Sequence, residues 1–216
     1  MEGNKFLTQI LSELDRLYAW DDKCFLFYRK PWELLFATIL SAQCTDDRVN
    51  KITPRLFSKY KSLSDFAEAN VNELEEIIKP TGFYHAKAKH IKESAYFLLH
   101  ELGGQMPNDI NILTKMPGVG RKTANIIRGH IFFIASIVVD THVKRISYRL
   151  GLTKNTNPEK IEYDLMETLP ESHWIRFNRQ IILHGRLICK ARNPKCNVCT
   201  LKEWCLISAV QPDNLA

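Results

Sequence analysis

Four cysteines near the C-terminal end of the chain have the types and spacing of a metal centre. Cys189, Cys196, Cys199 and Cys205 form a C-x6-C-x2-C-x5-C run. Four soft thiolates in so short a segment are suited to a soft metal or an iron-sulfur cluster. A zinc site usually has two separated C-x2-C pairs, whereas this run has one, so the spacing favours a cluster over zinc. Cys24 and Cys44 fit the alternative of buried cysteines without a ligand.

A glycine-containing turn between two short helical patterns is the second feature that could bind a ligand. The segment LTKMPGVGRKTANII places Pro117, Gly118, Val119 and Gly120 between the two patterns, which predicts a helix-hairpin-helix at about residues 110–130. Glycines let a phosphate approach the backbone, and the N–H groups at the start of the second helix attract an anion. A plain turn between packed helices needs only one glycine, so the pair favours DNA binding.

Lys122 follows Arg121 in the first turn of that second helix. A lysine with an unperturbed pKa of about 10.4 is almost entirely protonated at neutral pH and is a poor nucleophile. The positive end of the helix dipole, Arg121 and partial burial would all disfavour the ammonium form and increase the fraction of free amine. The residues alone leave two interpretations, a nucleophile and a phosphate-binding lysine.

The segment VVDTH ends an apolar run at Asp140, where a new amphipathic pattern begins. This position predicts a helix N-cap, a role that aspartate fills in any helical protein. A carboxylate at such a position could also stabilise developing positive charge in a reaction and assist proton transfer. The two roles are compatible.

Charge and composition indicate the partner and the compartment. The 216 residues carry a net charge of +6 with a pI near 9.0, which suits a polyanion. Lys190, Arg192 and Lys195 lie between the first two clustered cysteines, either as phosphate contacts or as a solvated loop. The sequence has no apolar run typical of a signal peptide or a membrane span, so we expect a cytoplasmic protein that associates with the nucleoid through DNA and does not contact a membrane.

Apolar residues recur at helical spacing along most of the chain, and strand alternation is almost absent, which predicts an all-α fold. Proline and glycine positions, among them Pro31, Pro54, Pro117 and Pro158, are expected to separate the helices. The run 131–139 is apolar and β-branched, and it fits either a buried strand or a connector between two lobes.

Several motifs together resemble one family, endonuclease III of the helix-hairpin-helix superfamily of DNA glycosylases. They occur in the family's order: LSAQCTDDRVNK, IKPTGFYHAKAKHI, MPGVGRKTAN, VVDTHVKR, LHGR and the cysteine run. The resemblance implies a two-lobed all-α glycosylase fold. A helical barrel domain would span 24–133 and contain the helix-hairpin-helix, while 1–23 and 134–216 would form a cluster domain.

The resemblance also implies roles for individual residues. Lys122 matches the Schiff-base nucleophile and Asp140 its carboxylate partner, and the four clustered cysteines match the ligands of a 4Fe-4S cluster. Gln43 and Phe83 match wedge positions that fill the gap left by an extruded nucleotide. Phe83 departs from the family's usual leucine, so an exposed loop aromatic is the alternative there. Gly118, Gly120, Arg121, Lys190, Arg192 and Lys195 complete the expected DNA contacts.

The implied activity is removal of oxidised pyrimidines from damaged double-stranded DNA, followed by β-elimination at the abasic site, by a protein that acts as a monomer. Relatives that act on adenine or G·T mispairs carry a similar cluster but lack a catalytic lysine at the position of Lys122. Two other classes stay open: a DNA-binding module would need Gly118 and Gly120 but neither Lys122 nor Asp140, and an electron carrier would use the cluster alone. The preferred lesion is not encoded in any motif.

Overall fold

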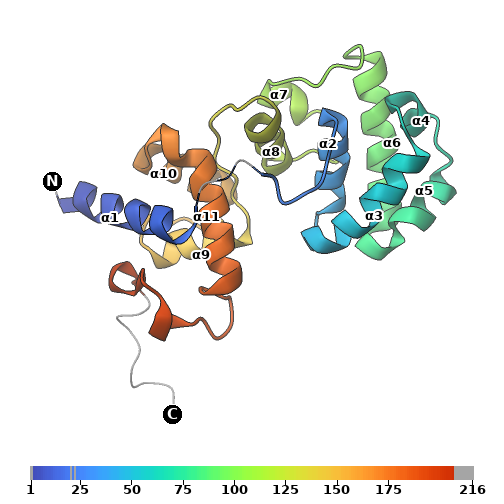
Figure 1. Cartoon of the computed structure of the whole chain (residues 1–216). Coiled ribbons are helices and arrows are strands. Elements are labelled where there is room, and N and C mark those ends of the chain that lie inside the picture. Colours follow the sequence, from blue (N-terminus) through green and yellow to red (C-terminus); the bar gives the residue numbers. More distant parts are fainter. Residues whose placement is uncertain (1, 20, 22, 207–216) are drawn as a thin grey trace. The chain divides into compact units, whose positions relative to one another are not determined.

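The computed structural model describes residues 2–19, 21 and 23–206, and in this part of the chain the secondary structure is entirely helical (Figure 1). The all-α prediction is therefore confirmed. None of the helices in these residues is long and apolar enough to cross a membrane. Residues 1, 20, 22 and 207–216 of the expected cluster domain lie outside the described residues.

The chain divides into two compact units, Lys23–Ile134 and Met1–Asp22 with Ala135–Ala216. Each unit has its own apolar core. The helices of the Lys23–Ile134 unit are α2 (Pro31–Leu40), α3 (Asp46–Lys59), α4 (Leu63–Ala67), α5 (Val71–Ile78), η1 (Lys79–Thr81), α6 (Tyr84–His100), α7 (Ile110–Leu113) and α8 (Arg121–Ile131).

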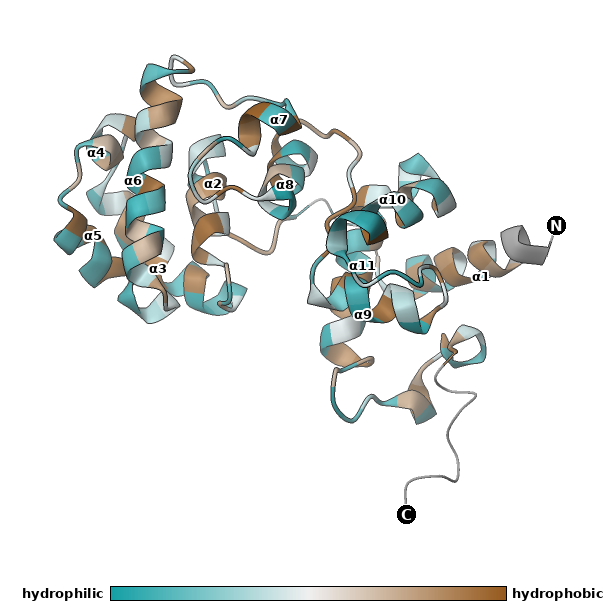
Figure 2. Ribbon diagram, turned by 180° about the vertical axis from the view of Figure 1, so that it is seen from behind, coloured by the Kyte–Doolittle hydropathy of each residue, from teal (hydrophilic) through white to brown (hydrophobic). Residues whose placement is uncertain are grey.

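Helix α2 is the central element of this unit, because every residue from Trp32 to Leu40 is buried. An all-round apolar helix is stable only when other helices cover it, and α2 packs against α3, α6 and α8. Figure 2 shows brown and teal alternating along the longer α6, as expected for a helix with one buried face. The sequence PWELLFATIL thus fixes the core around which the other helices are placed.

The expected helix break at Pro54 is wrong, because α3 continues through this residue. A proline inside a helix removes one backbone hydrogen bond and costs about 3 kcal/mol. Burial of Val49, Thr53 and Leu56 against the core offsets this cost. Tertiary packing therefore outweighs the local propensity of the proline.

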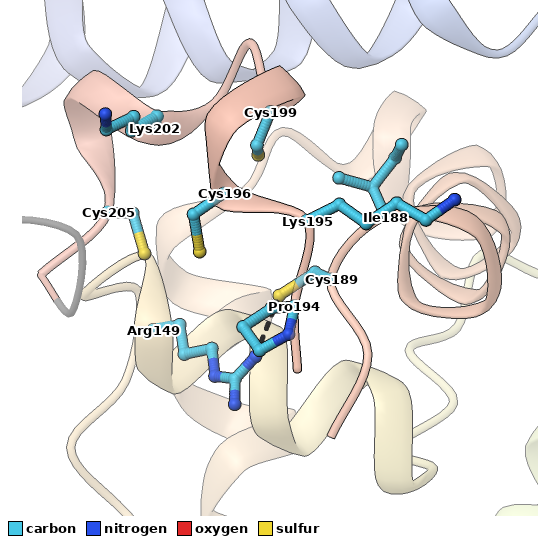
Figure 3. Close-up of a pocket in the computed structure, with 9 residues that line it drawn as sticks. All are labelled: Arg149, Ile188, Cys189, Pro194, Lys195, Cys196, Cys199, Lys202 and Cys205. Atoms are coloured by element: carbon cyan, nitrogen blue, oxygen red, sulfur yellow. Dashed lines mark hydrogen bonds between the residues drawn. The ribbon is translucent and has the colours of Figure 1, made fainter. Parts of the chain in front are cut away.

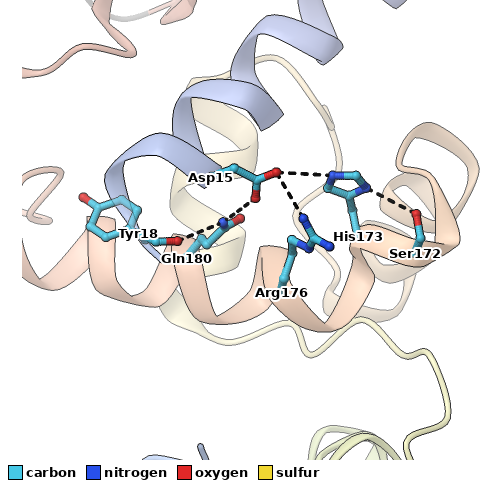
Figure 4. Close-up of polar contacts among 6 residues, drawn as sticks. All are labelled: Asp15, Tyr18, Ser172, His173, Arg176 and Gln180. Carbon is cyan, nitrogen blue, oxygen red and sulfur yellow. Dashed lines mark hydrogen bonds and ion pairs between the residues drawn. The ribbon is translucent and has the colours of Figure 1, made fainter. Parts of the chain in front are cut away.

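The second unit joins the two ends of the chain. Its helices are α1 (Glu2–Leu17), α9 (Thr141–Arg149), α10 (Pro158–Thr168), η2 (Glu171–His173), α11 (Trp174–Leu187), η3 (Cys196–Val198) and η4 (Lys202–Trp204). Asp15 on α1 fixes this helix to the α11 region (Figure 4). Its carboxylate accepts hydrogen bonds from Gln180 Nε2 at 2.7 Å and Arg176 Nη1 at 3.1 Å, and it pairs with His173 Nε2 at 3.7 Å.

The ambiguous run at 131–139 is not a strand. Helix α8 ends at Ile131, and residues 133–140 have no regular secondary structure before α9 begins at Thr141. The boundary between the two units falls within this run. Its apolar side chains include Ile137, which is fully buried in the core of the second unit.

The turn between α7 and α8 depends on the conformation of Gly118, whose φ is +76°. A Cβ added at this position would lie 2.7 Å from the Cβ of His90 on α6. Ser94, one turn further along α6, donates a hydrogen bond to the Pro117 carbonyl at 2.6 Å. Gly120 differs, because its φ is −88° and an added Cβ would meet nothing within 4 Å.

These two glycines predict effects of different size for the same substitution on stability. Gly118→Ala combines a left-handed backbone with a steric clash, so we expect it to destabilise the protein by roughly 1–3 kcal/mol. Gly120→Ala is the matched control, and the loss of an N-cap glycine should cost less than about 1 kcal/mol. Chemical denaturation of both variants measures the difference, and equal stability of the two would contradict this account of the turn.

Candidate functional site

The helix-hairpin-helix forms where the sequence predicts it, with α7, the turn at 114–120 and α8. Met116 and Val119 point into the core, which leaves Gly118 and Gly120 exposed. Gly120 is the N-cap of α8 and has no side chain to occupy the start of the helix. The dipole of an 11-residue helix therefore adds positive potential at an accessible glycine backbone, as an anion site requires.

Lys122 lies in the first turn of α8 and its side chain is exposed, whereas Arg121 beside it is half-buried. The expected partial burial of Lys122 is therefore wrong. The reason is the register of α8, which directs Ala124, Asn125 and Ile127 into the protein and Lys122 outward.

Gln43 and Phe83, the two residues at wedge positions, share an unusual backbone conformation. Both have positive φ, at 52° for Gln43 and 50° for Phe83. Non-glycine residues rarely adopt this conformation, and a bulky aromatic does so at a cost. Both side chains are exposed, and that of Phe83 is 66% accessible. The two loops thus hold large side chains out toward solvent.

Asp140 belongs to the second unit and is the N-cap of α9. The capping role predicted from the sequence is therefore confirmed. Its Oδ1 accepts hydrogen bonds from the backbone N–H groups of His142 and Val143, each at 2.8 Å. Its Oδ2 takes no part in the cap. One carboxylate oxygen therefore fixes the start of α9, and the cap does not need the other.

The four clustered cysteines line one pocket together with Arg149, Ile188, Pro194, Lys195 and Lys202 (Figure 3). Two of the thiols already have polar neighbours. Arg149 Nη1 lies 3.1 Å from Cys189 Sγ, and His184 Nε2 lies 3.6 Å from Cys199 Sγ. Three cations and no carboxylate line the pocket, so its electrostatics favour a negatively charged group.

The donor set fits an iron-sulfur cluster better than a single ion. In the described part of the chain, no three His, Cys, Asp or Glu side chains converge closely enough to hold one metal ion. Instead, all four thiols lie around one pocket. Four thiols spread around a larger space are what a cluster of several irons requires.

A buried histidine connects the cysteine pocket to α1. Burial lowers the pKa of His184 to about 4, so its imidazole is neutral and carries one N–H. A thiolate that ligated a cluster would only accept hydrogen bonds, so this role of Cys199 would require the proton on Nε2, facing the sulfur. Nδ1 then accepts from the hydroxyl of Tyr18 at 2.9 Å. Burial is also the main reason why the pKa of Tyr18 is raised to about 12.

Two arginines of α9 hold the loop that carries the basic residues. Arg145 Nη2 donates to the Cys189 carbonyl at 2.8 Å, and Arg149 Nη1 donates to the Lys190 carbonyl at 3.0 Å. Lys190, Arg192 and Lys195 are all exposed. Sequence reasoning missed both arginines and His184. The sequence signal for the role of the two arginines is the i, i+4 spacing of Arg145 and Arg149, which also fits a solvated helix face.

Comparison with known families and proteins agrees with this geometry. Residues 36–171 match the HhH-GPD superfamily of base excision DNA repair proteins, and residues 189–205 match the iron-sulfur binding domain of endonuclease III. The chain is 48% identical to endonuclease III of Synechocystis sp. over 92% of this chain and 90% of that protein. It is 41% identical to endonuclease III of Bacillus subtilis over 85% and 84% of the two chains.

Solved structures give the same result. An endonuclease III trapped as a covalent intermediate with DNA has a TM-score of 0.91 and 38% identity, covering 96% of this chain and 97% of its own. A thermostable thymine-DNA glycosylase shares the fold, with a TM-score of 0.86 and 24% identity over 96% and 99% of the two chains. The fold, the cysteine pocket and the level of identity together show that this chain belongs to the endonuclease III family of helix-hairpin-helix DNA repair enzymes.

Proposed function

We propose that the chain removes oxidised pyrimidines from duplex DNA and cuts the strand at the resulting abasic site, with Lys122 as the nucleophile. The observation that carries this proposal is the position of Lys122, which is exposed in the first turn of α8 beside the accessible glycine backbone of the hairpin. A phosphate held at the hairpin would bring the neighbouring sugar within reach of the amine.

The reaction follows from the chemistry of a primary amine. The amine attacks C1′ of the extruded nucleotide and the base leaves with the bonding electrons. Ring opening gives an imine between Lys122 and the sugar, and this imine acidifies the C2′ proton. Loss of that proton expels the 3′ phosphate by β-elimination, and water then hydrolyses the imine to release the enzyme.

The remaining residues have supporting roles in this proposal. Gln43 and Phe83 fill the gap in the duplex, and Gly118, Gly120 and Arg121 contact the backbone of the DNA. Lys190, Arg192 and Lys195 add phosphate contacts from the second unit. Residues 24–133 would then form the barrel domain, and 1–23 with 134–216 the cluster domain.

The 4Fe-4S cluster is held by Cys189, Cys196, Cys199 and Cys205, and we propose that it has a structural role. It connects the loop of residues 190–195 to α11 and, through His184 and Tyr18, to the end of α1. One chain supplies every residue of the proposed site, so we propose a monomer. The endonuclease III proteins of Synechocystis sp. and Bacillus subtilis are bacterial. We infer that this chain acts in the cytoplasm and associates with the nucleoid through DNA.

Cluster ligation predicts a coloured protein. The purified protein should be brown with broad visible absorbance, and Cys199→Ser should abolish most of it because one of four ligands is lost. Cys44→Ser is the control, since Cys44 lies in the other unit and should leave the absorbance unchanged. A colourless protein with stoichiometric zinc would contradict the cluster.

Asp140→Asn separates the capping role of this residue from its catalytic role. Asn157 already caps α10 through its Oδ1, with bonds of 2.9 Å and 3.2 Å to the N–H groups of Glu159 and Lys160. An asparagine at 140 should therefore keep the cap and change stability by a fraction of a kcal/mol. The amide has no negative charge and is a poor proton acceptor, so base removal should fall by roughly a hundredfold or more.

Single-turnover release of base from a thymine glycol duplex, measured beside a thermal melt, tests this prediction. The matched control is Asp109→Asn, because Asp109 caps α7 through Oδ1 in the same manner. The control should retain both stability and base release. Release near the wild-type rate by a folded Asp140→Asn variant would reduce Asp140 to a helix cap.

A further inference from the structure

Lys87 is a buried lysine that the proposed reaction does not use. Only 4% of the residue is exposed, although lysine is rarely buried without a partner. Its partners are two backbone carbonyls: Nζ donates to Leu40 O at 2.8 Å and to Thr81 O at 2.9 Å. In the described part of the chain the structure records no ion pair between Lys87 and a carboxylate. Burial lowers the pKa of this ammonium, because moving the charged form out of water costs free energy.

The two carbonyls belong to the segments that carry the wedge positions. Leu40 is the last residue of α2, and the turn that follows it contains Gln43. Thr81 ends η1, and Gly82 and Phe83 follow directly. Lys87 itself lies in the first turns of α6, whose N-cap is Phe83. One side chain therefore links two segments that lie far apart in the sequence.

Both wedge positions need such support, because Gln43 and Phe83 have positive φ. A non-glycine residue stays in this conformation only where its surroundings impose it. A primary ammonium has three donors and no acceptor, so it can bind two carbonyls at once and hold them at a fixed separation. A neutral side chain of similar length, such as methionine, has no donor for either carbonyl.

We propose that Lys87 is a positioning residue that holds the two loops together so that Gln43 and Phe83 enter the DNA gap as one unit. This inference rests on the proposed function of those two side chains as wedges. A wedge contributes most where a paired base has to leave the stack, because extrusion costs most there. Lys87 therefore serves extrusion of the nucleotide and not the chemistry at Lys122.

The test compares Lys87→Met with Lys92→Met on two duplexes under single-turnover conditions. Lys92 is the matched control because it lies on the same helix and its Nζ donates to one backbone carbonyl, Ala69 O, at 2.8 Å, away from both loops. A thymine glycol duplex requires extrusion of a paired base. A plain abasic duplex has no base to unstack at the lesion.

We expect Lys87→Met to slow base release from the thymine glycol duplex by about tenfold or more, as for loss of a group that positions the substrate. Cutting of the abasic duplex should slow by less than about threefold, because its extrusion costs less. Lys92→Met should match the wild type on both. In addition, 2-aminopurine next to the lesion should show a smaller fluorescence rise with Lys87→Met than with the control.

A double-substitution experiment separates positioning from general damage. In a Gln43→Ala, Phe83→Ala background the wedge is already absent, so adding Lys87→Met should cost little further base release. If Lys87→Met does not fold, Lys87→Gln, which keeps one short donor group, is compared on the same two duplexes.

Three outcomes overturn the inference: equal loss on both duplexes, no loss on either, or full additivity with the wedge substitutions. These three outcomes can be distinguished from a failure of the proposed function. A wild-type protein that neither releases the damaged base nor cuts the abasic duplex would refute the function and the inference together, whereas an active wild type with equal losses in Lys87→Met refutes only the inference.

Discussion

The buried face of α6 is the constraint on which the DNA-binding part of the Lys23–Ile134 unit depends. Lys87 donates hydrogen bonds to the carbonyls that precede the two proposed wedge loops, those of Gln43 and Phe83, and Ser94 donates one to the Pro117 carbonyl of the hairpin. Between them, His90 fills the space that only a glycine at 118 leaves open. These three side chains follow helical spacing along one face. A single rigid helix therefore sets the positions of both wedge loops and of the turn that leads to Lys122.

Helix α9 has the corresponding role in the second unit. Asp140 fixes its first turn, and Arg145 and Arg149 further along bind the carbonyls of Cys189, Lys190 and the thiol of Cys189. The proposed catalytic carboxylate thus lies at the N-terminus of α9, and arginines further along the same helix support the cysteine loop. In our proposal the cluster and these two arginines together order the loop that bears the proposed phosphate contacts. This arrangement agrees with the structural role that we propose for the cluster.

The sequence predicts the features whose partners are close in the chain. The cysteine spacing, the glycine turn and the Asp140 cap each depend on a few neighbouring residues, so local chemistry identifies them. The predictions that were wrong, and the residues whose roles were missed, depend on contacts between parts of the chain that are distant in sequence. Pro54 stays inside α3 because core packing outweighs its local cost, and Lys122 is exposed because the register of α8 is set by the core. The roles of Lys87 and His184 could not be predicted, because the groups that they contact lie in other segments of the chain.

The central claim is that one amine, that of Lys122, both displaces an oxidised pyrimidine and starts strand cleavage. The most direct measurement incubates the protein and Lys122→Ala with borohydride and duplexes that contain thymine glycol, an A·G mispair, a G·T mispair or a plain abasic site. The account predicts a covalent protein–DNA adduct on the thymine glycol and abasic duplexes, with cutting of both when borohydride is omitted, and no adduct with Lys122→Ala. Full cross-linking by Lys122→Ala, or activity restricted to the mispairs, would contradict it.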